Sequence, residues 1–140
     1  MNLAVQTRSA GPSAWRWLAG GLALAFGLVS LVEGGHVLFG GPEARAAAGN
    51  VVPFVLAFNF GSAFLYVATG VATLAGRGWA VWLARALAVG CALIFGALGV
   101  HVMLGGAFEP RTVVAMTLRT GFWLAQALVL PSLLRHRRVS

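Results

Sequence analysis

Charge is scarce in this sequence of 140 residues, and two of the charged residue types are missing. There is no lysine and no aspartate. Only 9% of the residues carry a charge, whereas about a quarter do so in soluble domains. Hydrophobic residues make up 59% of the chain, and the mean hydropathy is +0.86. This composition excludes an ordinary soluble domain and predicts an integral membrane protein.

Cysteine and the common catalytic motifs are also lacking. Cys91 is the single cysteine, which excludes an intrachain disulfide. The sequence contains no glycine-rich phosphate loop, no G-x-S-x-G elbow and no H-E-x-x-H motif. Its arginines are scattered between apolar runs and form no contiguous basic face, which excludes a nucleic-acid reader. We therefore expect a non-enzymatic protein that has the lipid bilayer, and no nucleic acid, as a partner.

Four long apolar runs predict four transmembrane helices, over residues 14–40, 51–74, 79–104 and 111–134. Each run exceeds the roughly 20 residues that a helix needs to cross a bilayer. The first run is too long for the apolar segment of a signal peptide. We therefore predict one transmembrane domain over residues 1–140, an all-α four-helix bundle that runs up, down, up and down. A polar loop is expected between the first two helices.

Arginine is concentrated on one side of this predicted bundle, where no acidic residue balances it. The arginines on that side are Arg8, Arg16, Arg77, Arg135, Arg137 and Arg138. By the positive-inside rule, both termini lie in the cytoplasm as short tails. Arginine without lysine is typical of a GC-rich bacterial genome, so we predict a multi-pass protein of a bacterial inner membrane.

Small residues recur at every fourth position in two of the predicted helices. They are Ala19, Ala23 and Gly27 in the first helix, and Ala84, Ala88, Ala92 and Gly96 in the third. This spacing lets helix backbones approach closely in lipid. Glu33 and His36 face away from the first series. Either that series meets a partner protomer, or a site at Glu33 opens toward a second neighbouring helix.

Glu33 and His36 interrupt the first apolar run three residues apart, and therefore on one face of the helix. At about 1.5 Å of rise per residue, they share the outer third of the bundle with Asn59, His101 and Arg119. These residues come from four helices, which is how a helix bundle assembles a site. We predict a polar pocket that faces the periplasm.

Polar residues also form stripes along the second and fourth predicted helices. The stripes are Asn59, Ser62, Tyr66, Thr69 and Thr73, and Thr112, Arg119 and Gln126, with Met116 and Trp123 beside the second stripe. Such stripes face the interior of a bundle in lipid. We expect the serine and threonine hydroxyls to form hydrogen bonds between helices.

Two segments resemble each other and suggest an internal repeat. His36–Gly41 reads HVLFGG and His101–Gly106 reads HVMLGG, an offset of 65 residues. Each segment ends a helix that runs outward. The sequence is therefore consistent with two tandem helical hairpins.

The leading hypothesis is a binding or accessory subunit that works in a homo-oligomer or a larger membrane complex. An alternative is a small proton-coupled transporter that works as a dimer through Glu33. For Glu33 itself, two roles stay open. It forms a structural ion pair with Arg119, or it binds a proton, a cation or a ligand amine.

The other alternative is a redox protein that binds haem b or copper. His36 and His101 lie at matching depth in the predicted bundle, and imidazoles from two helices are common ligands of both. Met103 and Met116 lie at a similar depth and would add soft ligands for copper.

Overall fold

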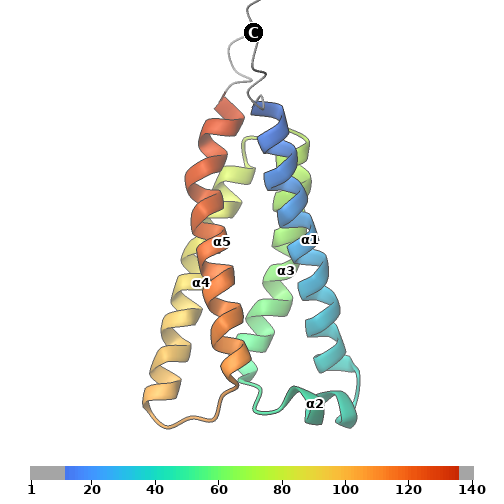
Figure 1. Ribbon diagram of the computed structural model, residues 1–140, viewed down its shortest axis with the longest axis vertical. Coiled ribbons are helices and arrows are strands. Elements are labelled where there is room, and N and C mark those ends of the chain that lie inside the picture. The colour runs from blue at the N-terminus through green and yellow to red at the C-terminus, as the bar shows by residue number, and fades with distance from the viewer. Residues whose placement is uncertain (1–11, 136–140) are drawn as a thin grey trace, which may run out of the picture.

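The structure is a computed structural model that describes residues 12–135, and within that range it contains helices and no strands. The helices are α1 (Pro12–Phe39), α2 (Pro42–Ala48), α3 (Pro53–Leu74), α4 (Ala80–Met103) and α5 (Pro110–Arg135). The four long helices run alternately up and down, and both described chain ends lie at the same end of the bundle (Figure 1). The predicted all-α four-helix bundle is confirmed, and the ends of the four long helices lie within two residues of their predicted positions. Residues 1–11 and 136–140, which hold most of the two predicted tails, lie outside the described residues.

Each of the four long helices is long and apolar enough to cross a membrane. The shortest, α3, has 22 residues. A helix of that length spans about 33 Å, slightly more than the ~30 Å hydrocarbon core of a bilayer. Large apolar side chains are exposed along all four helices, among them Leu93 and Leu128. Such a surface is typical of helices that face lipid, and the chain is a multi-pass membrane protein.

The short α2 is a difference from the prediction, which placed a polar loop between the first two long helices. Pro42 occupies the start of α2, where its missing N–H costs nothing, and Glu43 follows in the first turn. The remaining residues are mostly alanines, which favour helix. Gly41 and Gly49 flank α2 with φ of 86° and 76°, a conformation that glycine adopts most easily.

Helix α1 packs most closely on α3, at contacts where glycine is required. A Cβ atom on Gly27 would lie 2.8 Å from the Val67 side chain, and one on Gly70 would lie 2.7 Å from the backbone nitrogen of Leu24. Ala23 is also fully buried here. The small-residue series of α1 therefore meets α3 of the same chain.

The corresponding series of α4 fills an interface only in its first half. Ala84 and Ala88 are buried in the main apolar cluster, whereas Ala92 and Gly96 are exposed. The outer half of the series therefore lies on a surface that no helix of residues 12–135 covers.

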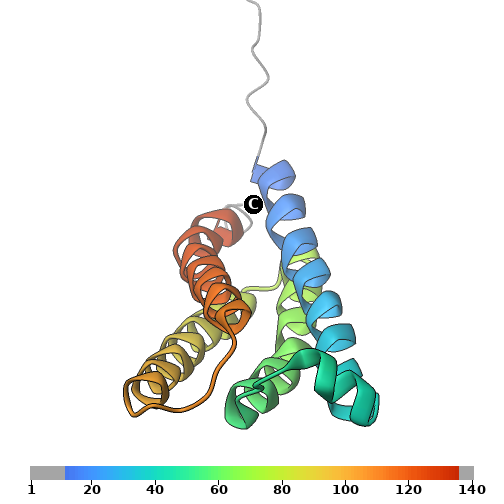
Figure 2. The ribbon, with the colours of Figure 1, turned by 60° about the horizontal axis from the view of Figure 1, so that its bottom comes forward.

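The bundle consists of two hairpins, α1 with α3 and α4 with α5, which α3 and α4 join (Figure 2). Contacts between α1 and α5 are fewer than those within either hairpin. These are the two hairpins that the repeat predicts. In residues 104–109, however, no helix corresponds to α2, so the two connections differ.

The polar stripes face inward as predicted. Ser62, Tyr66, Thr69 and Thr73 of α3 are buried, and so are Met116, Arg119, Trp123 and Gln126 of α5. The expectation of hydrogen bonds between helices is wrong for three hydroxyls of α3, because these hydroxyls donate to carbonyls of their own helix. The bonds are Ser62 to Asn59, Thr69 to Leu65 and Thr73 to Thr69.

Candidate functional site

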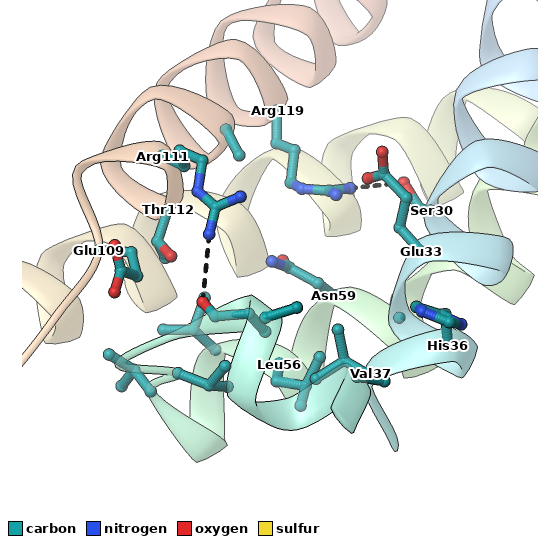
Figure 3. Close-up of a pocket in the computed structure, with 18 residues that line it drawn as sticks. Ser30, Glu33, His36, Val37, Leu56, Asn59, Glu109, Arg111, Thr112 and Arg119 are labelled. Carbon is teal, nitrogen blue, oxygen red and sulfur yellow. Dashed lines mark hydrogen bonds between the residues drawn. The ribbon is translucent and has the colours of Figure 1, made fainter. Parts of the chain in front are cut away.

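A cavity of about 490 Å³ lies at the end of the bundle that carries α2. Its walls come from α1, α2, α3, α5 and the segments that flank α2 (Figure 3). The polar side chains that line it are Ser30, Glu33, His36, Asn59, Glu109, Arg111, Thr112 and Arg119. Alanine and valine residues make up most of the remaining wall. The predicted site residues Glu33, His36, Asn59 and Arg119 are thus brought together in one pocket.

Arg119 is the deepest charge of this pocket. It is only 7% exposed, because α5 turns the face that carries Thr112, Arg119 and Gln126 toward the bundle. Its Nη1 donates to the Ser30 Oγ at 2.7 Å, which joins α5 to α1 (Figure 3). The guanidinium also lies over the rings of Phe26 and Tyr66, 5.1 Å and 5.9 Å from their centroids. These contacts hold the cation in place through α1 and α3.

Two buried polar atoms of the pocket have no hydrogen-bond partner within residues 12–135. They are Nε of Arg119 and Oδ1 of Asn59. A buried group of this kind costs about 1–3 kcal/mol, and a charge inside a membrane costs more. Because most buried polar atoms in proteins are satisfied, this pair marks a place in the cavity where a ligand or water would find a donor and an acceptor.

Glu33 lies one helical turn beyond Ser30 on α1, and its exposed carboxylate faces the same cavity (Figure 3). Within residues 12–135, Glu33 forms no ion pair or hydrogen bond with Arg119, which donates to Ser30 instead. The structure therefore does not contain the structural ion pair with Arg119, which was one of the two roles left open for Glu33.

The rim of the pocket ties α2 and its flanks to the start of α5. Oε1 of Glu109 accepts a hydrogen bond from the backbone nitrogen of Asn50 at 2.8 Å. Nη2 of Arg111 donates to the carbonyl of Ala48 at 3.3 Å (Figure 3). Sequence reasoning assigned neither Glu109 nor Arg111 to the site. The sequence signal that could have found them is their position beside Pro110, which starts the helix that carries Arg119.

The structure separates the residues proposed for haem or copper. His36 is exposed and lines the pocket, whereas His101 does not belong to its walls. Nε2 of His101 donates to the carbonyl of Ala107 at 2.9 Å, and its ring packs edge-on against Phe54. Met103 is 87% exposed, and Met116 is fully buried in an apolar cluster. Among the described residues, no group of three or more His, Cys, Asp or Glu side chains could hold a metal ion.

Comparisons with family models, with curated proteins and with solved structures found no match for this chain. The geometry of the pocket therefore carries the functional inference by itself.

Proposed function

We propose that this chain is a non-enzymatic binding subunit of a bacterial inner membrane, which holds a small polar molecule in a pocket that faces the periplasm. The observation that carries the proposal is the buried guanidinium of Arg119, whose Nε has no partner among the described residues, in the same pocket as the Oδ1 of Asn59, which has none there either. A membrane protein keeps such a costly charge where the charge has a use.

The charge distribution supports the orientation. Arg16 near the start of α1, Arg77 between α3 and α4, and Arg85 near the start of α4 belong to the end of the bundle that holds both described chain ends. At the opposite end, the acidic residues Glu43 and Glu109 balance the charges of Arg45 and Arg111. The positive-inside rule then places the first end in the cytoplasm and the pocket toward the periplasm.

The pocket favours binding over catalysis. Its walls offer charges and hydrogen-bonding groups that recognise a molecule. A nucleophilic hydroxyl needs a neighbouring base. In the described part of the chain, however, the Ser30 hydroxyl is engaged by the guanidinium of Arg119.

We also propose that the chain works in a homo-oligomer or a larger membrane complex. Ala92 and Gly96 support this, because they continue the small-residue series of α4 on an exposed surface where another helix would approach closely.

Proton-coupled transport through a dimer is the second candidate function. The observation that favours it is the carboxylate of Glu33, which faces the cavity without a cationic partner in residues 12–135. A carboxylate in this position would exchange a proton for a ligand amine.

A cysteine in the pocket wall tests the proposed binding function. Ala115→Cys in right-side-out membrane vesicles should react with sulfonatoethyl methanethiosulfonate, an anionic reagent that does not cross membranes. The native Cys91 is fully buried and should stay unlabelled. Gly78→Cys, in the turn between α3 and α4, should react only in inside-out vesicles.

The same cysteine tests the role of Arg119. In an Arg119→Gln background, the anionic reagent should label Ala115→Cys several-fold more slowly, whereas a neutral reagent of similar size should react equally in both backgrounds. The proposal fails if Ala115→Cys stays unlabelled from both sides, or if it reacts only from the cytoplasmic side.

A further inference from the structure

The two unpartnered atoms of the pocket have opposite hydrogen-bonding character. Nε of Arg119 is a donor, and Oδ1 of Asn59 is an acceptor. The Asn59 amide projects into the space between α1 and α5 (Figure 3). A molecule that satisfies both atoms must therefore present an acceptor to Arg119 and a donor to Asn59.

The charges around the cavity point to the same kind of molecule. The titratable side chains that face it are Glu33, His36, Glu109, Arg111 and Arg119. Glu109 and Arg111 already bond to the backbone of Asn50 and Ala48 at the rim. Away from this rim, the charges that line the cavity are the anion of Glu33 and the cation of Arg119, whose Nε has no partner among the described residues.

The two opposite charges of the cavity disfavour a ligand that carries only one charge. A monoanion on Arg119 would share the cavity with the like charge of the Glu33 carboxylate, and a monocation on Glu33 would share it with the like charge of the guanidinium. A molecule that carries both charges finds an opposite charge for each and adds no net charge to the membrane.

We infer that the pocket binds a small zwitterion, with its acidic group on Arg119 and its primary amine between the Glu33 carboxylate and Oδ1 of Asn59. This inference rests on the proposed binding function and names its ligand class. The cavity of about 490 Å³ has the size of a small-molecule site.

The spacing along α1 limits the length of the ligand. Arg119 is anchored 2.7 Å from the Ser30 hydroxyl, and Glu33 follows Ser30 by three residues. Three residues correspond to about 4.5 Å of helix rise. The acid and the amine of the ligand therefore lie only a few bonds apart. A free amino acid has this arrangement, and so does the headgroup of an ethanolamine phospholipid.

Equilibrium dialysis of the full chain in phosphatidylglycerol nanodiscs tests the inference. The probes are radiolabelled glycine and O-phosphoethanolamine as zwitterions, acetate as the anion and methylammonium as the cation. At least one zwitterion should bind at least about tenfold more tightly than acetate and methylammonium, because it gains a charge-assisted hydrogen bond that each of them lacks.

Matched variants assign the two charges. Arg119→Gln and Glu33→Gln should each weaken zwitterion binding by at least about tenfold. Arg85→Gln and Glu43→Gln remove the same charges outside the pocket and should leave binding unchanged. Because Glu33 is exposed, Glu33→Gln keeps the test decisive even if Arg119→Gln does not fold.

Addition of phosphatidylethanolamine to the nanodiscs distinguishes the two sources of the zwitterion. Weaker binding of the soluble zwitterion in these bilayers identifies the lipid headgroup as a competing occupant. Unchanged binding identifies a soluble molecule. Either outcome supports the inference.

Three results would overturn the inference, and they differ in what they say of the proposed function. If acetate binds as tightly as the zwitterions and still needs Arg119, or if Glu33→Gln binds glycine normally, the zwitterion is wrong and the binding function stands. If no probe binds while Ala115→Cys is labelled from the periplasm, the inference of a zwitterionic ligand is wrong and the pocket still opens toward the periplasm. If no probe binds and Ala115→Cys is unreactive, both proposals are wrong.

Discussion

Gly70→Ala should destabilise the bundle, because α1 and α3 touch through their backbones at this position. The added Cβ would lie 2.7 Å from the backbone nitrogen of Leu24 and 2.9 Å from the carbonyl oxygen of Gly20. Ordinary contacts of a Cβ atom begin at 3.4 Å, so α1 must withdraw from α3 by about 0.7 Å. No side-chain rotation relieves a clash with backbone. Overpacking of this kind costs about 1–3 kcal/mol.

Gly61→Ala on the same helix is the matched control. Nothing lies within 4 Å of a Cβ atom at Gly61, so this change adds only the helix preference of alanine, about 1 kcal/mol. Gly70→Ala gains the same preference, and the difference between the two variants isolates the packing cost. Unfolding in mixed micelles with increasing SDS should show Gly70→Ala less stable than Gly61→Ala by about 1–3 kcal/mol. Equal stabilities would refute the close approach of α1 and α3.

Glu109→Ala should loosen the segment around α2, because the backbone nitrogen of Asn50 loses its acceptor. Hydrogen exchange in residues 42–50 should accelerate several-fold, consistent with a loss of about 1 kcal/mol, whereas Glu43→Ala should leave exchange at Asn50 unchanged. Unchanged exchange in Glu109→Ala would show that the hydrogen bond between Asn50 and Glu109 does not hold this segment. Gly105→Ala should lower the free energy of unfolding by about 1–2 kcal/mol, because Gly105 has a φ of 83°. Gly99→Ala, in open space within α4, should show no loss, and equal losses in the two variants would rule out backbone strain at Gly105.

The four long helices were predictable because their signals are local. Apolar runs and the glycines and prolines between them act within a few residues of sequence, and bilayer thickness fixes how long a run must be. Helix α2 was missed for the opposite reason. Residues 42–48 carry charges and belong to a short connection, so polarity outweighed the helix preference of their alanines.

The candidate site was predictable by depth and face, but its contacts were not. The spacing of Thr112, Arg119 and Gln126 correctly turned Arg119 inward. Ser30 carried no signal, because a single serine in an apolar run usually bonds to its own helix. His101 shares the depth of His36, yet residues 104–109 fold back and offer it the carbonyl of Ala107. Depth along a helix therefore predicts which residues share a layer, whereas loop geometry decides which of them meet.

The place of the pocket follows from how unevenly the helices pack. Glycines draw α1 onto α3, so the face of α1 that carries Ser30 and Glu33 is left toward α5, which α1 contacts less closely than α3. In the described part of the chain, two side-chain hydrogen bonds cross this seam between α1 and α5: Gln126 donates to the carbonyl of Ala19 at 3.0 Å, and Arg119 donates to Ser30. A ligand held by Glu33 on one hairpin and Arg119 on the other would add a third link across the seam. Since it would bind the assembled bundle and not separated hairpins, it should stabilise their association in proportion to its occupancy.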